Sequence, residues 1–459
     1  MSRKLELLSP LGPKTLRQRV LHAGGWNIAG YSLGRALALV TNLIMTRLLA
    51  PEMFGVMAIA AVVPHTLLML ADVGLRQNIV RSHRGEDPVF LDTAWVVQII
   101  RGVTAWFVTL GLSIALHFAI HWEAFPPDSV YASPVLPAVI AVSSLTAIIA
   151  GFQSTKWAIA FRRFDQKRIA QIELTAQIVA LPFMVAIGVA THSIWALVSG
   201  GLVASLTTTI LSHAWMSGDR NRLRWDKDAF RELISFGRWI FVSSAVGVIA
   251  GSCSSLMLGA MLSADELGLF VIAGLILGAV GGGFGRMFGQ IGLPALSEIA
   301  RNEPSRLREV YYKMRVPIDL FLLFLTGLVF TSGQLVIDLL YDPRYAGAGN
   351  FLEILALGFF AVRYGPAKEV YLALGIPRYG ALLNVVGFVS LFSVVPLLYY
   401  LAGTQGAIWG MALNGLAGVL LVLSINAHLR LNDYRRELIV LVALPVGFLC
   451  GSILNSLGG

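Results

Sequence analysis

Charged residues are scarce in this chain. Asp, Glu, Lys and Arg make up 13% of its 459 residues, against about 25% in soluble domains, which leaves too few charges to coat a water-exposed surface. Cysteine is almost absent as well. Cys253 and Cys450 each stand within an apolar stretch, which argues against a disulfide framework and against a cysteine-based metal site. The composition therefore excludes a soluble globular protein.

Motifs for common enzyme chemistry are also missing. The chain contains no Walker motif, no G-x-S-x-G elbow and no H-E-x-x-H pair, so it offers no support for ATP hydrolysis or for common hydrolase activity. His117 and His121 are four residues apart, but no third ligand is in view, and we expect interfacial packing rather than metal binding. We therefore expect no catalytic residue, no metal and no cofactor.

Apolar sequence, in contrast, is abundant. Stretches of the roughly 20 apolar residues that a spanning helix needs recur along the whole chain. No connection between them is long enough to fold into a domain, and the longest one expected on the outer side of the membrane covers residues 121–133. The pattern predicts an all-α, polytopic membrane protein with about thirteen transmembrane helices, at 24–46, 54–75, 93–120, 134–155, 171–189, 194–215, 233–261, 266–295, 316–340, 348–373, 380–401, 406–428 and 437–455.

The basic residues lie almost entirely on one side of these predicted spans. The amino-terminal segment 1–23 and alternate connections carry 27 of the 35 Lys and Arg residues, whereas the opposite side carries two, Arg47 and Arg344. The positive-inside rule makes the basic side cytoplasmic. The amino-terminal segment has no signal-peptide cleavage site, so we expect it to stay in the cytoplasm. The net charge of +9 is explained by the basic residues of the cytoplasmic segments, so it does not indicate nucleic-acid binding.

An internal repeat appears at an offset of 213 residues. LLAPEMFGVMAIA at 48–60 then aligns with MLSADELGLFVIA at 261–273, which places Gly55 on Gly268. Chance similarity of two apolar stretches is the alternative. Six spans per half would make the halves parallel repeats. The sequence thus predicts two six-helix lobes around a central cavity, at 24–220 and 233–429, joined by a cytoplasmic linker at 221–232 and followed by an extra helix within 430–459.

Three arginines lie deep within the predicted spans. Arg35 stands in the first span, Arg286 in the eighth and Arg363 in the tenth. An arginine at the bilayer centre costs at least about 2.5–3.5 kcal/mol, so such residues usually face a cavity or a partner. Each arginine is either an anion ligand in the cavity, to which its planar fork is suited, or half of a buried pair with an acid.

Five weaker candidates accompany these arginines. Arg101 lies at a depth that does not decide between headgroups and a cavity, and His65 follows Pro64, which interrupts the second span and frees a backbone carbonyl. The acids that are placed to pair with the arginines are Asp72, Asp319 and Glu369. We keep all five as candidate cavity or coupling residues.

Several segments together resemble one known family. They are RLLAPEMFGVMAIAAVV at 47–63 and LADVGLRQNIV at 70–80, followed by KWAIAFRRFDQKRIAQIE, LPALSEIARNEPSRLREVYYKMR and LVIDLLYDPRYAGAGNFLEILALG. Each segment is loose, but their order and spacing resemble the polysaccharide transporter, or Wzx-type flippase, family. That family belongs to the multidrug/oligosaccharidyl-lipid/polysaccharide exporter superfamily. The resemblance covers residues from about 24 to 430.

The resemblance implies a function. It implies a flippase of the bacterial inner membrane that moves oligosaccharide linked to polyprenyl (undecaprenyl) diphosphate to the outer leaflet by alternating access, with polysaccharide polymerase and export machinery as further partners. In related lipid II flippases, basic residues of helices 1 and 8 line the cavity, which corresponds at the helix level to Arg35 and Arg286. The alternatives are a flippase for lipid II or another lipid-linked precursor and a multidrug or cation antiporter. An extra thirteenth helix departs from the twelve-helix core of the family.

Overall fold

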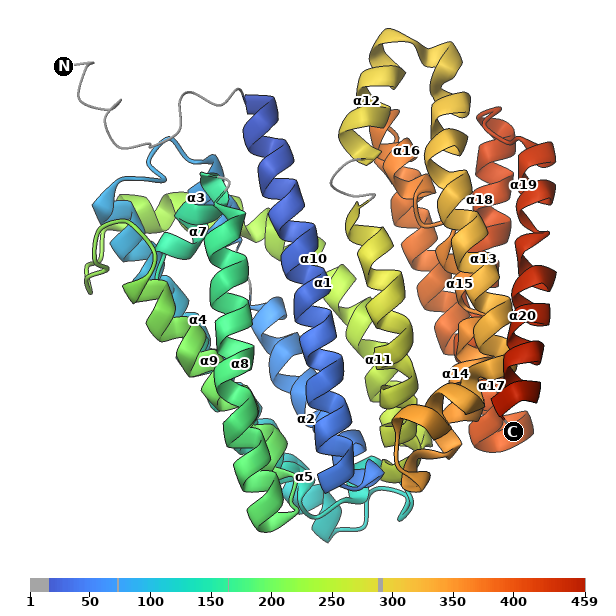
Figure 1. Ribbon diagram of the computed structural model, residues 1–459. Coiled ribbons are helices and arrows are strands. Elements are labelled where there is room, and N and C mark those ends of the chain that lie inside the picture. The colour runs from blue at the N-terminus through green and yellow to red at the C-terminus, as the bar shows by residue number, and fades with distance from the viewer. Residues whose placement is uncertain (1–15, 72–73, 164, 288–291, 459) are drawn as a thin grey trace.

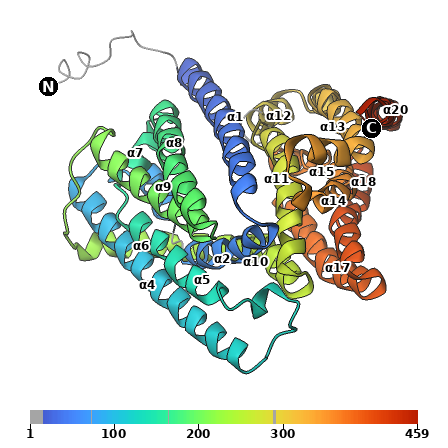
Figure 2. The ribbon, with the colours of Figure 1, turned by 60° about the horizontal axis from the view of Figure 1, so that its bottom comes forward.

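The structure is a computed structural model that describes residues 16–71, 74–163, 165–287 and 292–458. Every regular element in these ranges is a helix. Figure 1 shows the helices in two groups that lie close together at the bottom and diverge toward the top, where α1 begins. Figure 2 shows the same two groups from the end at which they meet, with α2, α10 and α11 between them.

The first group contains the amino-terminal helices. Its members are α1 (Leu16–Leu48), α2 (Pro51–Leu70), α3 (Leu75–Arg81), α4 (Pro88–His121), α5 (Leu136–Ser143), α6 (Leu145–Gly151), α7 (Lys156–Arg162), α8 (Gln166–Thr191) and α9 (Trp195–Ala214). A 3-10 turn, η1 (Val130–Ala132), precedes α5. Helix α8 packs between α1 and α9, and these three helices form one face of the group.

The second group contains the remaining helices. Its members are α10 (Lys227–Met261), α11 (Ala264–Met287), α12 (Leu293–Asn302), α13 (Leu307–Leu340), α14 (Gly347–Ala356), α15 (Phe359–Val362), α16 (Ala367–Ala373), α17 (Pro377–Leu413), α18 (Leu416–His428), α19 (Tyr434–Val440) and α20 (Ala443–Gly458). The 3-10 turn η4 (Pro343–Tyr345) links α13 to α14. Helix α10 begins within the predicted linker 221–232, and its Leu233 is buried among side chains of the first group.

Aspartate N-caps start several helices at the basic end of the molecule. The side chain of Asp87 accepts a hydrogen bond from the backbone N–H of Val89 at the start of α4, and Asp226 accepts one from Ala229 in α10. An aspartate side chain at this position pairs one of the N–H groups that an α-helix leaves unsatisfied, and it also interacts favourably with the helix dipole. The short polar connections thus define where the long apolar helices begin.

The described helices agree with an integral membrane protein. Eight helices within the described residues are long and apolar enough to cross a membrane, and nine are if the bent pair formed by α5–α6 and α7 counts as one span. Within the described residues, the thirteen predicted spans fall on helical segments, but several of these are short or broken, and the total of thirteen stays a prediction. Helix α1 begins at the top of Figure 1 and α20 ends at the bottom.

The predicted boundary between two spans near residue 403 appears as a break inside α17. Ala402 has φ −142° and Gly403 has φ +59°, so the helix is interrupted at these two residues. Glycine adopts positive φ at little cost, whereas other residues rarely do. The segment of α17 before the break corresponds to the predicted span 380–401, and the segment after it, together with α18, corresponds to 406–428.

The repeat relates two helices that cross between the groups. A Cβ built on Gly55 of α2 would lie 2.0 Å from the carbonyl oxygen of Ala264, and one built on Gly268 of α11 would lie 1.9 Å from that of Pro51. The offset of 213 residues maps Pro51 onto Ala264 and Gly55 onto Gly268. Each partner therefore makes the same contact with its counterpart, as two elements related by a two-fold axis do.

The last helix packs along α13 through glycine. A Cβ on Gly447 would lie 2.0 Å from the carbonyl oxygen of Phe324, and one on Gly451 would lie 2.1 Å from the hydroxyl of Thr331. Small residues four positions apart let membrane helices approach until their backbones touch. The extra helix expected at the carboxyl end is thus an integral part of the second group.

Candidate functional site

Arg35 is exposed on the face of α1 that is turned toward α11. It lies 13 residues before the end of α1, which corresponds to about 20 Å along the helix axis. Tyr31 lies one turn earlier on the same face, and its ring is 5.2 Å from the Arg35 guanidinium carbon. A Cβ on Gly282 of α11 would lie 2.1 Å from the Tyr31 hydroxyl. This contact shows that the face of α1 that carries Tyr31 and Arg35 is turned toward α11.

Helix α11 has glycines at the same level. Gly274 and Gly278 would each meet no atom within 4 Å if a Cβ were added, so there is space beside this part of α11. We call Tyr31 and Arg35 of α1, with Gly278 and Gly282 of α11, the interlobe face. The backbone of Arg286 lies one turn beyond Gly282 in α11, but its side chain is outside the described part of the structure.

At the opposite end from the basic connections, buried tyrosines join the two groups. The Tyr341 hydroxyl donates a hydrogen bond of 3.0 Å to Oδ1 of Asn42, and the Tyr345 hydroxyl donates one of 2.8 Å to the carbonyl oxygen of Leu49. Both bonds are buried. They connect the end of α1 to the end of α13 and to η4, so this end of the molecule is closed between the groups.

Arg47 and Arg344, the two basic residues that the sequence places on this side, also take part in contacts between the groups. Arg344 donates from Nη2 to the carbonyl oxygens of Thr46 and Arg47, at 3.3 and 3.2 Å, and Arg47 donates to the carbonyl oxygen of Leu340 at 3.3 Å. These carbonyls belong to the last turns of α1 and α13, where helices leave acceptors unpaired and favour cations. Arg344 Nε donates a hydrogen bond of 2.9 Å to Oδ1 of Asp342, which orients the arginine side chain. This hydrogen bond lowers the pKa of Asp342.

A second contact completes the closure in the other half of the repeat. The Tyr131 hydroxyl in η1 donates a hydrogen bond of 2.9 Å to the carbonyl oxygen of Leu256 in α10. The offset of 213 residues maps Tyr131 onto Arg344 and Leu43 onto Leu256. In each half, the residue in the connection therefore binds the first helix of the other half.

A buried ion network lies within the second group, near its basic end. Arg315 of α13 contacts Asp319 at 2.9 Å and Glu437 of α19 at 2.7 Å. Arg363 faces the same two acids at 3.8 and 3.4 Å. The hydroxyls of Tyr312 and Tyr364 donate to Glu437 at 2.9 and 3.0 Å. Two cations and two anions thus balance in the interior.

This network accounts for two of the sequence candidates. Arg363 is 2% exposed and Asp319 is 1% exposed, so the pair is buried rather than presented to the interlobe face. For Arg363 the structure supports the alternative of a buried pair with an acid. The sequence reasoning missed Arg315, which it counted in a cytoplasmic connection, and Glu437. The spacing of four residues between Arg315 and Asp319 was an available signal, because such residues face each other on a helix.

The remaining weaker candidates lie apart from one another. His65 is exposed on α2, and Glu369 is half-buried on α16 beside Lys368. Asp72 lies outside the described residues. Arg101 of α4 lines a separate polar cavity, so the structure does not bring these candidates together into one site.

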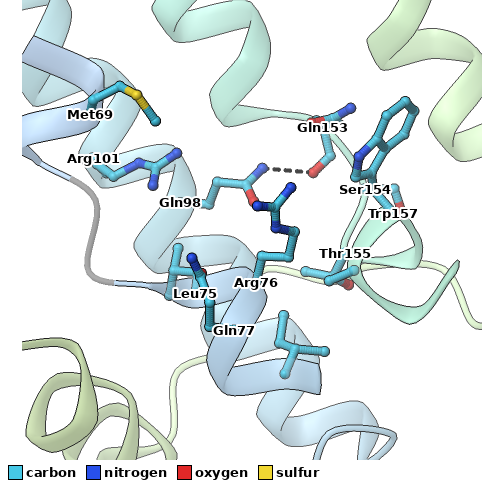
Figure 3. A pocket seen from close by; sticks show the side chains of 12 residues that line it. Met69, Leu75, Arg76, Gln77, Gln98, Arg101, Gln153, Ser154, Thr155 and Trp157 are labelled. Carbon is cyan, nitrogen blue, oxygen red and sulfur yellow. Dashed lines mark hydrogen bonds between the residues drawn. The ribbon is translucent and has the colours of Figure 1, made fainter. Parts of the chain in front are cut away.

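This polar cavity lies at the basic end of the first group, between α3, α4 and α7 (Figure 3). Its volume is about 250 Å³. Gln98 is fixed beside it, because its amide donates to the carbonyl oxygens of Ala150, Gly151 and Gln153 at 3.2, 3.0 and 2.8 Å. The guanidinium groups of Arg76 and Arg101 approach Gln98 from either side in Figure 3.

The fold defines a class of protein: a polytopic helical membrane protein with the architecture of the multidrug/oligosaccharidyl-lipid/polysaccharide exporters. Two solved structures carry this likeness. The chain is similar to the lipid II flippase MurJ in an inward closed conformation, with a TM-score of 0.61 and 13% identity over 93% of this chain and 97% of that one. It is also similar to a multidrug resistance MATE family transporter in an inward-facing conformation, with a TM-score of 0.65 and 13% identity over 86% and 94% of the two chains.

The chain belongs to the polysaccharide biosynthesis protein family, whose model matches residues 44–350. Among curated proteins it is 22% identical, over 90% of this chain and 82% of the other, to an uncharacterized membrane protein in the cps region of Klebsiella pneumoniae. It is 20% identical, over 75% and 67%, to the lipopolysaccharide biosynthesis protein WzxC of Escherichia coli K12. The family expected from the sequence is thereby confirmed, and the two solved structures share the fold.

Proposed function

We propose that this protein moves the headgroup of a polyprenyl (undecaprenyl) diphosphate-linked oligosaccharide from the cytoplasmic to the periplasmic leaflet of a bacterial inner membrane. The observation that carries the proposal is Arg35, an exposed arginine in the middle of a membrane helix, on the face turned toward the other lobe. A cation at that depth needs water or an anionic partner. The names of the curated relatives, which refer to lipopolysaccharide biosynthesis and a cps region, favour a glycan precursor.

The closure between the groups supports alternating access as the mechanism. With the basic side assigned to the cytoplasm, the hydrogen bonds of Tyr341 and Tyr345 close the periplasmic end. A diphosphate headgroup would enter from the cytoplasm, bind Arg35 between the lobes, and leave when these contacts separate. Its polyprenyl tail would stay in lipid throughout. The interface between the two lobes can permit two discrete arrangements, which are related by a rigid-body movement of one lobe against the other.

The competing functions make different demands on the interlobe face. A cation or drug antiporter of this fold would need acids there, whereas Arg35 is a cation. The name of the MurJ relative as a lipid II flippase keeps lipid II as the second candidate substrate, because lipid II is also a polyprenyl diphosphate. An enzyme that polymerises or ligates glycans would need a sizeable outer loop, and the segment 121–133 is too short for one.

Deletion of the gene in its natural host tests the function directly. We expect a lipid-linked oligosaccharide to accumulate on the cytoplasmic face, because synthesis continues while export stops. The measurement is the amount and sidedness of lipid-linked sugars, with a plasmid-borne copy as the control. Wild-type surface glycan in the deletion strain would contradict the proposal. A defect confined to peptidoglycan would assign lipid II as the substrate instead.

Arg35→Ala tests the binding residue. Each hydrogen bond to a charged group contributes about 1.5–3 kcal/mol, so we expect at least about a tenfold loss of export. The measurement is surface glycan in the deletion strain complemented with the variant. Arg231→Ala is the matched control, because the Arg231 side chain is 83% exposed near the start of α10, at the basic end. Arg35→Lys should restore part of the activity. Full export by Arg35→Ala at normal protein levels would remove Arg35 from the site.

A further inference from the structure

The cavity in Figure 3 lies at the end of the first group where apolar helices give way to polar connections. It is lined by Met69 at the end of α2 and by Gln153 just after α6. These two helices end at the basic side, so the cavity is at the level at which the apolar spans give way to polar connections. Phosphate groups of lipids occupy this interfacial layer of a bilayer, outside the hydrocarbon core.

The side chains that line the cavity suit an anion. The described lining contains two arginines, three glutamines and two hydroxyl residues, and none of the described lining residues is an acid. Arg76 lies over the ring of Phe161, with its guanidinium carbon 4.8 Å from the ring centre, which holds the flexible side chain in place. Even with Asp72, which stands between the lining residues Met69 and Leu75 in the sequence, arginines outnumber acids.

The size of the cavity limits what can enter. A volume of about 250 Å³ is many times what one water requires, so the cavity can hold a small polyatomic group such as a phosphodiester or a diphosphate. An oligosaccharide is much larger than either group, so we place any sugar of a bound lipid outside the cavity.

We propose that this cavity binds the phosphate or diphosphate group of a membrane lipid, with Arg76 and Arg101 as the charged ligands. Arginine donates two parallel hydrogen bonds to phosphate oxygens, and two arginines at one site bind a phosphate from both sides. The site is distinct from the interlobe face, because its residues come from α2, α3, α4 and the α6–α7 connection, whereas that face belongs to α1 and α11. The phosphate has two sources, an anionic phospholipid or a polyprenyl diphosphate.

The test measures lipid retained by the purified full-length protein. The protein is placed in dodecyl maltoside micelles, which contain no phosphate, and phosphatidylglycerol or undecaprenyl diphosphate is added. Native mass spectrometry then counts the lipids that stay bound. We expect the double variant Arg76→Gln/Arg101→Gln to retain at least about tenfold less of one lipid than the wild type. Arg231→Gln/Arg301→Gln, which removes two exposed charges from the basic side, should retain the wild-type amount.

The two lipids distinguish the sources. A loss confined to phosphatidylglycerol identifies an anionic phospholipid, and a loss confined to undecaprenyl diphosphate identifies a precursor lipid. Arg76→Lys/Arg101→Lys keeps the charges, and partial recovery shows that the loss is not caused by misfolding. Equal retention of both lipids by the wild type and the glutamine variant overturns the proposal. The Arg76→Gln/Arg101→Gln change should lower retention equally when it is made in a protein that already carries Arg35→Ala, so failure here is separable from failure of the proposed function.

Discussion

Glu437→Ala is expected to destabilise the protein by about 3–5 kcal/mol, the range seen when one partner of a buried ion pair is removed. Glu437 accepts hydrogen bonds from Arg315 and from two tyrosines, and it also faces Arg363. Without it, two buried arginines would share the single carboxylate of Asp319. The measurement is the thermal unfolding midpoint of the purified protein in detergent.

Two variants make this result specific. Glu437→Gln keeps the size and part of the hydrogen bonding of the side chain, so its midpoint should lie between those of the wild type and Glu437→Ala. Glu309→Ala is the matched control, because Glu309 is an exposed acid in the first turn of α13. If Glu437→Ala unfolded at the same temperature as Glu309→Ala, the ion network would not anchor the last helix pair to its lobe.

Gly268→Ala is expected to weaken the closure at the end opposite the basic connections and to reduce export. The added Cβ would lie 1.9 Å from the carbonyl oxygen of Pro51, so α2 and α11 would have to move apart. Overpacking of this kind costs about 1–3 kcal/mol, which shifts an equilibrium between two conformations about 5- to 150-fold. Gly55→Ala should have a similar effect because it makes the equivalent contact, 2.0 Å from the carbonyl oxygen of Ala264.

Labelling of a buried cysteine measures this effect. Leu49→Cys, at a side chain that is 0% exposed, is introduced after Cys253 and Cys450 have been replaced. A membrane-impermeant maleimide added from outside should label it faster when Gly268→Ala is also present. Gly274→Ala is the matched control on the same helix, because a Cβ there meets no atom within 4 Å. Identical labelling rates in Gly268→Ala and Gly274→Ala would show that the helix crossing does not maintain the closure.

Composition and periodicity were sufficient for the class of fold. An apolar run long enough to span a bilayer has few structures available to it, because hydrocarbon leaves backbone polar groups no partner except one another. The break at Gly403 could be expected for the same local reason, since glycine adopts its positive φ readily. The internal repeat could also be recognised in the sequence, and the reciprocal contacts of Gly55 and Gly268 agree with it.

The candidate site was predicted less well, and the three deep arginines show why. All three have the same sequence signal, a cation within an apolar stretch. Arg35 is exposed on a face between the lobes, whereas Arg363 is buried against acids from α13 and α19. The acid Glu437 that separates the two cases is 74 positions after Arg363. Nothing local to either arginine could indicate that distant partner.

By itself, the sequence determined that the chain is a helical membrane protein and which segments are apolar. These properties depend on residues that are neighbours along the chain, through burial in lipid, helix capping and the distribution of Lys and Arg. Only the tertiary structure decided which charges pair and which stay exposed. It also decided that Arg47 and Arg344 meet across the lobes. Such contacts join residues far apart in the chain, and helix packing rather than local preference brings them together.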